Sequence, residues 1–115
     1  MNDSVNTSSP SARRKARRFA LQALYQWQLS GNDLSEIELQ FRRDNDMKKV
    51  DREYFSELLH GVPANVDALD GALQPALDRK VTELSQVEKV ILRIGAFELI
   101  PDDATLARLA GRKLR

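Results

Sequence analysis

The sequence predicts an all-α protein, and three observations agree on this class. Apolar residues recur at steps of three and four in each long segment, which places them along one face of a helix. Residues that start or stop helices stand at the ends of these segments. No segment shows the convincing alternation of apolar and polar residues that a half-buried strand requires. We therefore expect helices throughout the ordered part of the chain.

The first helix is expected at about residues 11–29, and Gly31 is a natural C-terminal cap for it. At about 100° per residue, its apolar residues gather on one face. This predicted core face comprises Ala16, Phe19, Ala20, Ala23, Leu24 and Trp27. Residues 1–10 are rich in serine and asparagine and lack apolar anchors, so we expect a disordered lead there.

Two further helices are expected in the middle of the chain. One begins at Asp33, which has capping-box spacing to Glu36. The other starts near Asp51 and carries a long apolar stripe. Pro63 lies inside this stripe and removes one backbone hydrogen bond, so we expect a kinked helix that then resumes. Pro75 is expected to distort or end it.

A fourth long helix opens with the capping box Ser85-Gln86-Val87-Glu88 and is stopped by Pro101. Its predicted apolar face comprises Val87, Val90, Ile91, Ile94 and Phe97. A last, weak helix is expected at residues 103–109, before a basic tail at residues 111–115. We therefore divide the chain into the lead, a helical domain at residues 11–100 and an atypical tail at residues 101–115.

The composition excludes several kinds of function. Hydrophobic residues make up 42% and charged residues 30% of the 115, as in ordinary soluble globular domains. There is no cysteine and only one histidine, so a disulfide framework, a thiolate nucleophile and a histidine cluster are excluded. No apolar run approaches the roughly 20 residues of a membrane span. We expect a cytoplasmic protein that is not an enzyme and uses no cofactor or metal.

The carboxylates and the histidine support no catalytic assignment. Asp44, Asp46 and Asp51 are scattered, and we expect them to solvate loops or cap helices. His60 precedes a glycine and is expected to be a surface residue at a helix end. Motifs for a phosphate-binding loop, a zinc protease or a nucleophile elbow are absent from the sequence.

The first helix carries the most informative polar residues. Five of the six residues from 13 to 18 are basic: Arg13, Arg14, Lys15, Arg17 and Arg18. The side opposite the core stripe is predicted to carry Arg14, Arg18, Gln22 and Tyr25. Arginine pairs bidentately with phosphate, and an outward tyrosine can stack on an unpaired base. RNA binding is one interpretation. The other is that the charges solvate the helix while Tyr25 packs on a neighbouring helix.

Several motifs, in order, resemble the NusB family of bacterial transcription antitermination factors over about residues 12–100. The resemblance is carried by ARRKAR (12–17), QALYQWQL (22–29), VD (50–51), YF (54–55), LHGV (59–62), ELSQVEK (83–89), ILRI (91–94) and FEL (97–99). It implies an N-terminal three-helix bundle followed by a second bundle. It also implies binding to the boxA element of ribosomal RNA leader transcripts together with the ribosomal protein NusE. That complex assembles with RNA polymerase and other Nus factors.

The resemblance also implies roles for individual residues. The family's RNA-binding segment falls on Arg13, Arg14, Lys15 and Arg17. Its RNA-facing tyrosine falls on Tyr25, and a glutamate near the NusE contact falls on Glu88. After Pro75 this chain has Ala76 where the family often has a tyrosine, so one RNA contact is expected to be missing.

Beyond residue 100 the sequence departs from the family pattern. We therefore expect an incomplete second bundle and a truncated or frame-shifted gene product, in which Val87, Ile91, Ile94 and Phe97 are poorly covered. Two alternatives to an RNA-binding factor remain open. One is an interaction module that binds NusE but binds RNA weakly. The other is a NusB-like domain detached from a ribosomal RNA methyltransferase, although the sequence has no segment for its cofactor.

Overall fold

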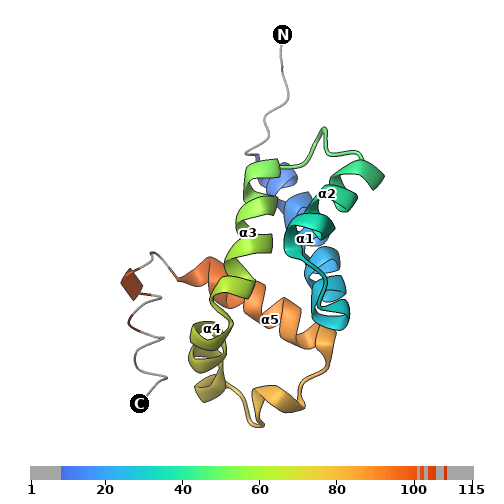
Figure 1. Cartoon of the computed structure of the whole chain (residues 1–115). Coiled ribbons are helices and arrows are strands. Elements are labelled where there is room, and N and C mark those ends of the chain that lie inside the picture. Colours follow the sequence, from blue (N-terminus) through green and yellow to red (C-terminus); the bar gives the residue numbers. More distant parts are fainter. Residues whose placement is uncertain (1–8, 101, 103, 106–107, 109–115) are drawn as a thin grey trace. The chain divides into compact units, whose positions relative to one another are not determined.

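The computed structural model describes residues 9–100, 102, 104–105 and 108. All regular elements in these residues are helical, which confirms the all-α prediction (Figure 1). Within residues 9–100 the α-helices are α1 (Pro10–Ser30), α2 (Leu34–Asp44), α3 (Arg52–Ala64), α4 (Val66–Leu73) and α5 (Gln86–Leu99). Single 3-10 turns lie at Gln74–Ala76, where Pro75 ends the α-helix, and at Val81–Glu83. The chain divides into two compact units, with the division after His60.

Helix α1 has well-defined caps at both ends. Ser9 is its N-cap and accepts a hydrogen bond from the amide of Ala12 at 3.1 Å. Pro10 occupies the first turn, where a missing amide proton does no harm. Gly31 adopts φ 71° and donates to the carbonyl of Trp27 at 2.8 Å, as predicted for the C-terminal cap. The rest of the predicted lead, residues 1–8, lies outside the described residues.

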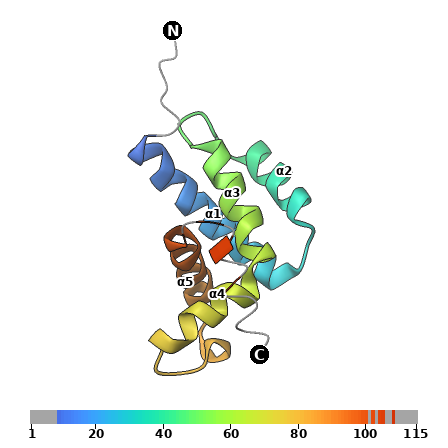
Figure 2. The same cartoon turned by 90° about the vertical axis from the view of Figure 1, so that its left-hand side faces the viewer.

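The core of the first unit forms where α1, α2 and the first two turns of α3 meet (Figure 2). Three aromatic rings join the helices: Phe19 meets Phe41 edge to face at 5.3 Å between ring centroids, and Phe41 stacks on Phe55 at 5.6 Å. The small buried residues of α1 allow neighbouring side chains to approach its backbone. The fully or nearly buried core residues here are Ala12, Ala16, Ala20, Ala23, Leu24, Ile37, Phe55, Leu58 and Leu59.

His60 lies within α3, so its predicted position at a helix end was wrong. Its Nε2 lies 2.7 Å from Oε1 of Glu38 on α2, and Arg42 donates to the other oxygen of Glu38 at 2.9 Å. The pair His60-Gly61 suggested a helix end because glycine commonly follows one. Gly61 is helical here, and the ring of Phe97 occupies the space beside it.

The third predicted helix is two helices, and the prediction of one kinked helix was wrong. Helix α3 ends one residue after Pro63, and Asn65 separates it from α4. Asn65 has φ −125° and ψ 23°, which interrupts the helical path. Its side-chain amide donates to the carbonyl of Gly61 at 2.7 Å and so satisfies one of the acceptors at the end of α3.

In the second unit, α4 packs on α5 (Figures 1 and 2). Arg93 of α5 and Asp70 of α4 form two parallel hydrogen bonds, each of 2.8 Å. The apolar core between these helices and the loop before α5 comprises Ala68, Leu69, Val81, Leu84, Val90 and Ile94. The predicted capping box of α5 is confirmed: Ser85 accepts from the amide of Glu88 at 3.1 Å, and Glu88 accepts from the amide of Ser85 at 2.9 Å.

The expectation of a poorly covered face on α5 is confirmed only in part. Val87 and Ile91 are 44% and 51% exposed. Ile94 is only 6% exposed, so the expectation was wrong for this residue, and Phe97 is half-buried against Gly61. The predicted helix at residues 103–109 and the basic tail at residues 111–115 lie largely outside the described residues. Where the chain is described, no helix combines the length and apolar character needed to cross a membrane.

Candidate nucleic-acid interface

Helix α1 has two chemically distinct sides. The side opposite its buried alanines exposes Arg14, Arg18 and Gln22, and Tyr25 is 38% exposed. The outward orientation inferred from spacing is therefore confirmed, whereas a nucleic-acid contact stays a prediction. Among the described residues, neither Arg14 nor Arg18 forms an ion pair, so their guanidinium groups are available to an anion.

The charge of α1 has a single sign. The segment Pro10–Ser30 contains five basic residues and no aspartate or glutamate. Basic residues in the first turns oppose the helix dipole, and no acidic residue there offsets them. Such an arrangement concentrates positive potential at one end of a chain whose net charge is only +1.

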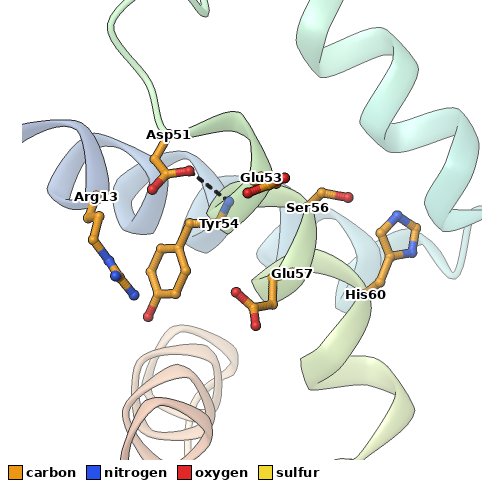
Figure 3. A pocket seen from close by; sticks show the side chains of 7 residues that line it. All are labelled: Arg13, Asp51, Glu53, Tyr54, Ser56, Glu57 and His60. Carbon is orange, nitrogen blue, oxygen red and sulfur yellow. Dashed lines mark hydrogen bonds between the residues drawn. The ribbon is translucent and has the colours of Figure 1, made fainter. Parts of the chain in front are cut away.

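The basic residues of α1 form two neighbouring rows. Arg14 and Arg18 point outward, whereas Arg13 and Arg17 turn toward Tyr54 of α3. The guanidinium carbon of Arg13 lies 3.9 Å from the centre of the Tyr54 ring (Figure 3). That of Arg17 lies 5.8 Å from the same centre. Both distances are within the range of a cation–π interaction. Lys15, the remaining basic residue, is half-buried.

Tyr54 is the residue that the sequence analysis missed. The motif Tyr54-Phe55 supported the family resemblance, but its spacing alone did not bring Tyr54 to the basic block. The docking of α3 on α1 does so. The amide of Asp51 donates to the carbonyl of Ala12 at 3.2 Å, and the Asp51 carboxylate caps α3 by accepting from the amide of Tyr54 at 3.0 Å. Asp51 is therefore a helix cap, as predicted.

An acidic groove borders the basic rows on the α3 side (Figure 3). Its lining residues are Arg13, Asp51, Glu53, Tyr54, Ser56, Glu57 and His60. Three of these are acidic and only one is an arginine, so the groove repels phosphate.

Glu88, the predicted partner-binding residue, is exposed at the first turn of α5. The hydrogen bond from the Ser85 amide holds the pKa of Glu88 below its usual range, assisted by the Ser85 hydroxyl and by Arg79. Arg79 lies 3.4 Å from the second carboxylate oxygen. Glu88 is thus an ionised acceptor, with one oxygen in the helix cap and the other shared with an exposed arginine.

Within the described residues, no three histidine, cysteine, aspartate or glutamate side chains are placed to hold a metal ion. Together, the fold and the basic face define a class: a small all-helical protein that presents an arginine-rich, tyrosine-bearing helix to solvent. The chain belongs to the NusB family, whose model matches residues 14–108.

Curated members of the family are close to this chain in sequence. The chain is 68% identical over 94 residues to the transcription antitermination protein NusB of Alcanivorax borkumensis, an alignment that covers 82% of this chain and 63% of that protein. It is 59% identical over 87 residues to the NusB protein of Legionella pneumophila, covering 76% of this chain and 59% of that protein. The NusB protein of Yersinia enterocolitica is 53% identical over 94 residues, with 82% and 68% covered. The chain thus spans about three fifths of the length of the first two relatives.

Proposed function

We propose that this protein acts in transcription antitermination by binding single-stranded boxA RNA of ribosomal RNA leader transcripts together with the ribosomal protein NusE. It works in the bacterial cytoplasm as a binding subunit, without catalysis, and joins the RNA polymerase complex through other Nus factors. The observation that carries the proposal is the outward face of α1, which is basic, free of acidic residues and tyrosine-bearing, in a chain that is 68% identical to an antitermination protein.

The proposed roles follow from side-chain chemistry. The phosphate-binding residues are Arg13, Arg14, Lys15, Arg17 and Arg18, because guanidinium and ammonium groups neutralise the backbone charge of RNA. Gln22 and Tyr25 lie further along the same face. There Gln22 can hydrogen-bond a base edge, and Tyr25 can stack on an unpaired base, as in other single-strand binders.

The second proposed contact is with NusE, through Glu88. Its carboxylate is exposed, and its partner Arg79 is exposed as well, so a protein partner can replace that ion pair with contacts of its own. We also propose that α1, α2 and the start of α3 form the N-terminal three-helix bundle of the family. Helices α4 and α5 then belong to a second bundle that is incomplete within the described residues, which accounts for the exposure of Val87 and Ile91.

The test is fluorescence anisotropy with a labelled boxA RNA and a scrambled RNA, with and without NusE, across a salt series. If three to five cations engage phosphates, log K falls with log salt at a slope of about −2 to −3.5. The charge reversal Arg14→Glu with Arg18→Glu should abolish binding and leave the helical circular dichroism intact. The matched control reverses two exposed cations outside the proposed surface, Arg43→Glu with Lys48→Glu, and should retain binding.

Two outcomes contradict the proposal. Equal affinity for boxA and scrambled RNA would reduce the surface to a generic basic patch. NusE binding without RNA binding would favour the second candidate, an interaction module, which the exposed Glu88 beside the exposed Val87 of α5 supports.

A further inference from the structure

We propose that Tyr54 is a positioning residue of the RNA-binding surface: its ring holds the Arg13 guanidinium in place before RNA arrives. The inference rests on the proposed function and assigns a role to a residue of α3, outside the basic segment of α1. Tyr54 acts through Arg13 and need not contact RNA itself.

The stacking geometry leaves Arg13 competent to bind phosphate. The guanidinium carbon lies over the Tyr54 ring, 3.9 Å from its centre. From this short distance we infer that the flat face of the guanidinium stacks on the ring. The donor N–H groups lie in the guanidinium plane and point away from its face. Among the described residues, Arg13 forms no ion pair that would occupy those donors. A phosphate can therefore accept hydrogen bonds from the N–H groups at the edge of the Arg13 guanidinium while its face remains stacked on the Tyr54 ring.

Tyr54 is itself held firmly, which a positioning residue requires. Asp51 connects it to α1 through two hydrogen bonds, one to the carbonyl of Ala12 and one from the amide of Tyr54. The next residue, Phe55, is fully buried and stacks on Phe41 of α2. The backbone that carries the ring is thus fixed to both α1 and α2. The contact with α1, at Ala12, lies one residue away from Arg13.

The stack acts on Arg13 in two ways. A free arginine side chain samples many rotamers, and holding it in one before binding lowers the entropy lost with the RNA. The neighbouring groove also offers the carboxylates of Glu53 and Glu57. An ion pair with either of them would draw the guanidinium away from α1, and the stack on Tyr54 competes with it. Removing the ring therefore weakens RNA binding without removing a cation.

The first measurement compares Tyr54→Leu, which keeps apolar volume without a π face, with Tyr54→Phe, which keeps the ring. The whole 115-residue chain is titrated against labelled boxA RNA. We expect the Kd to rise about two- to fivefold for Tyr54→Leu, the range of an exposed cation–π contact, and to stay within about twofold for Tyr54→Phe. Equal affinity of Tyr54→Leu and the unaltered protein overturns the inference.

A double-mutant cycle separates positioning from general structural support. In an Arg13→Gln background, Tyr54→Leu should weaken RNA binding no further, because the group it positions is gone. If the two substitutions act additively, Tyr54 supports the fold and does not act through Arg13. If the unaltered protein binds neither boxA RNA nor scrambled RNA, the proposed function itself fails and this inference fails with it.

A measurement on the unaltered protein does not depend on how the variants fold. In an NMR spectrum of the protein, the Nε–Hε proton of Arg13 is assigned as the signal that disappears in Arg13→Gln. The ring current of Tyr54 should shift this signal upfield relative to the Nε–Hε signal of Arg14. Absence of the shift in the free protein overturns the inference. Its presence, together with a cycle that is not additive, establishes Tyr54 as a positioning residue.

Discussion

Gly61 shows how one atom can decide the packing of a helix pair. A Cβ added at this position would overlap Cζ of the Phe97 ring and lie 2.7 Å from its Cε1, closer than packed atoms allow. The glycine is helical and needs no special backbone conformation. A glycine is needed at position 61 because the Phe97 ring approaches the backbone too closely to leave room for a Cβ.

We predict that Gly61→Ala destabilises the protein by about 1–3 kcal/mol, because the ring must move or leave its site. The free energy of unfolding, measured by urea titration, reports the change. Gly95→Ala is the matched control, since its added Cβ meets nothing within 4 Å. In the helix α5 it should be neutral or stabilising by up to about 1 kcal/mol. Equal effects of the two substitutions would contradict the packing argument.

Glu38 joins α2 to α3, and its ionisation makes stability depend on pH. Burial raises the pKa of Glu38, but hydrogen bonds from His60, Arg42 and Ser56 together hold it below its ordinary value of 4.5. A carboxyl with a lowered folded-state pKa stabilises the protein above the unfolded-state pKa. That stabilisation is lost as the pH falls through the folded-state pKa.

Accordingly, Glu38→Gln should cost about 1–2 kcal/mol at neutral pH, through the loss of charge-assisted hydrogen bonds. The difference from the unaltered protein should start to shrink as the pH falls below about 4.5, where the carboxyl of the unfolded chain takes up a proton, and it should disappear below the lowered folded-state pKa. Urea titrations at a series of pH values measure it. A difference that stays constant down to pH 3 would exclude Glu38 as the titrating group. Glu36→Gln, on the exposed side of α2, should have little effect at any pH.

Among the elements, the C-terminal end of α1 and the start of α5 were predictable because their caps are local. Ser85 and Glu88 satisfy each other's amides without help from distant residues, and Gly31 ends α1 in the left-handed conformation. The start of α2 differs in detail. Asp33 accepts from the amide of Ser35 at 2.8 Å, one position before the capping-box partner Glu36.

Removal of the α5 cap should destabilise the protein by a measurable amount. Ser85→Ala leaves the amide of Glu88 without its acceptor and should lower the free energy of unfolding by about 1 kcal/mol. Thermal unfolding followed by circular dichroism measures this. Ser35→Ala, at an exposed position in the first turn of α2, is the matched control and should change stability by less than about 0.5 kcal/mol. A similar loss in both variants would argue against the capping assignment.

In the molecule as a whole, α5 carries both buried and exposed apolar residues. Ile94 is buried, whereas Val87 and Ile91 of the same helix are exposed. Exposed apolar residues that lie together favour association or a partner. Periodicity placed all three on one face, and only the packing of α4 on α5 distinguishes them.

We therefore predict that the protein self-associates as its concentration rises, and that Ile91→Glu reduces this association. Sedimentation velocity across a concentration series measures it. Because Ile91 is 51% exposed, the substitution should leave the thermal midpoint nearly unchanged. Ile94→Glu places a charge at a position only 6% exposed and should unfold the protein. Association that is identical in Ile91→Glu and in the unaltered protein would contradict the prediction.

Features that depend on near neighbours in the chain could be predicted from the amino-acid sequence alone. These are the helical class, the bounds of α1, the caps at Gly31 and Ser85, and the separation of α1 into a core face and a basic face. Each follows from hydrogen bonds or periodicity within a few residues. The proposed RNA-binding residues of α1 belong to this group, because they share one helix.

The packing of the helices was needed to establish the features that depend on residues far apart in sequence. It placed His60 against Glu38 and the Arg13 guanidinium over the ring of Tyr54. It also showed that Gly61 remains in α3, where spacing had suggested a helix end. Long-range packing is set by which apolar side chains fit together, and helical spacing carries no information on that choice.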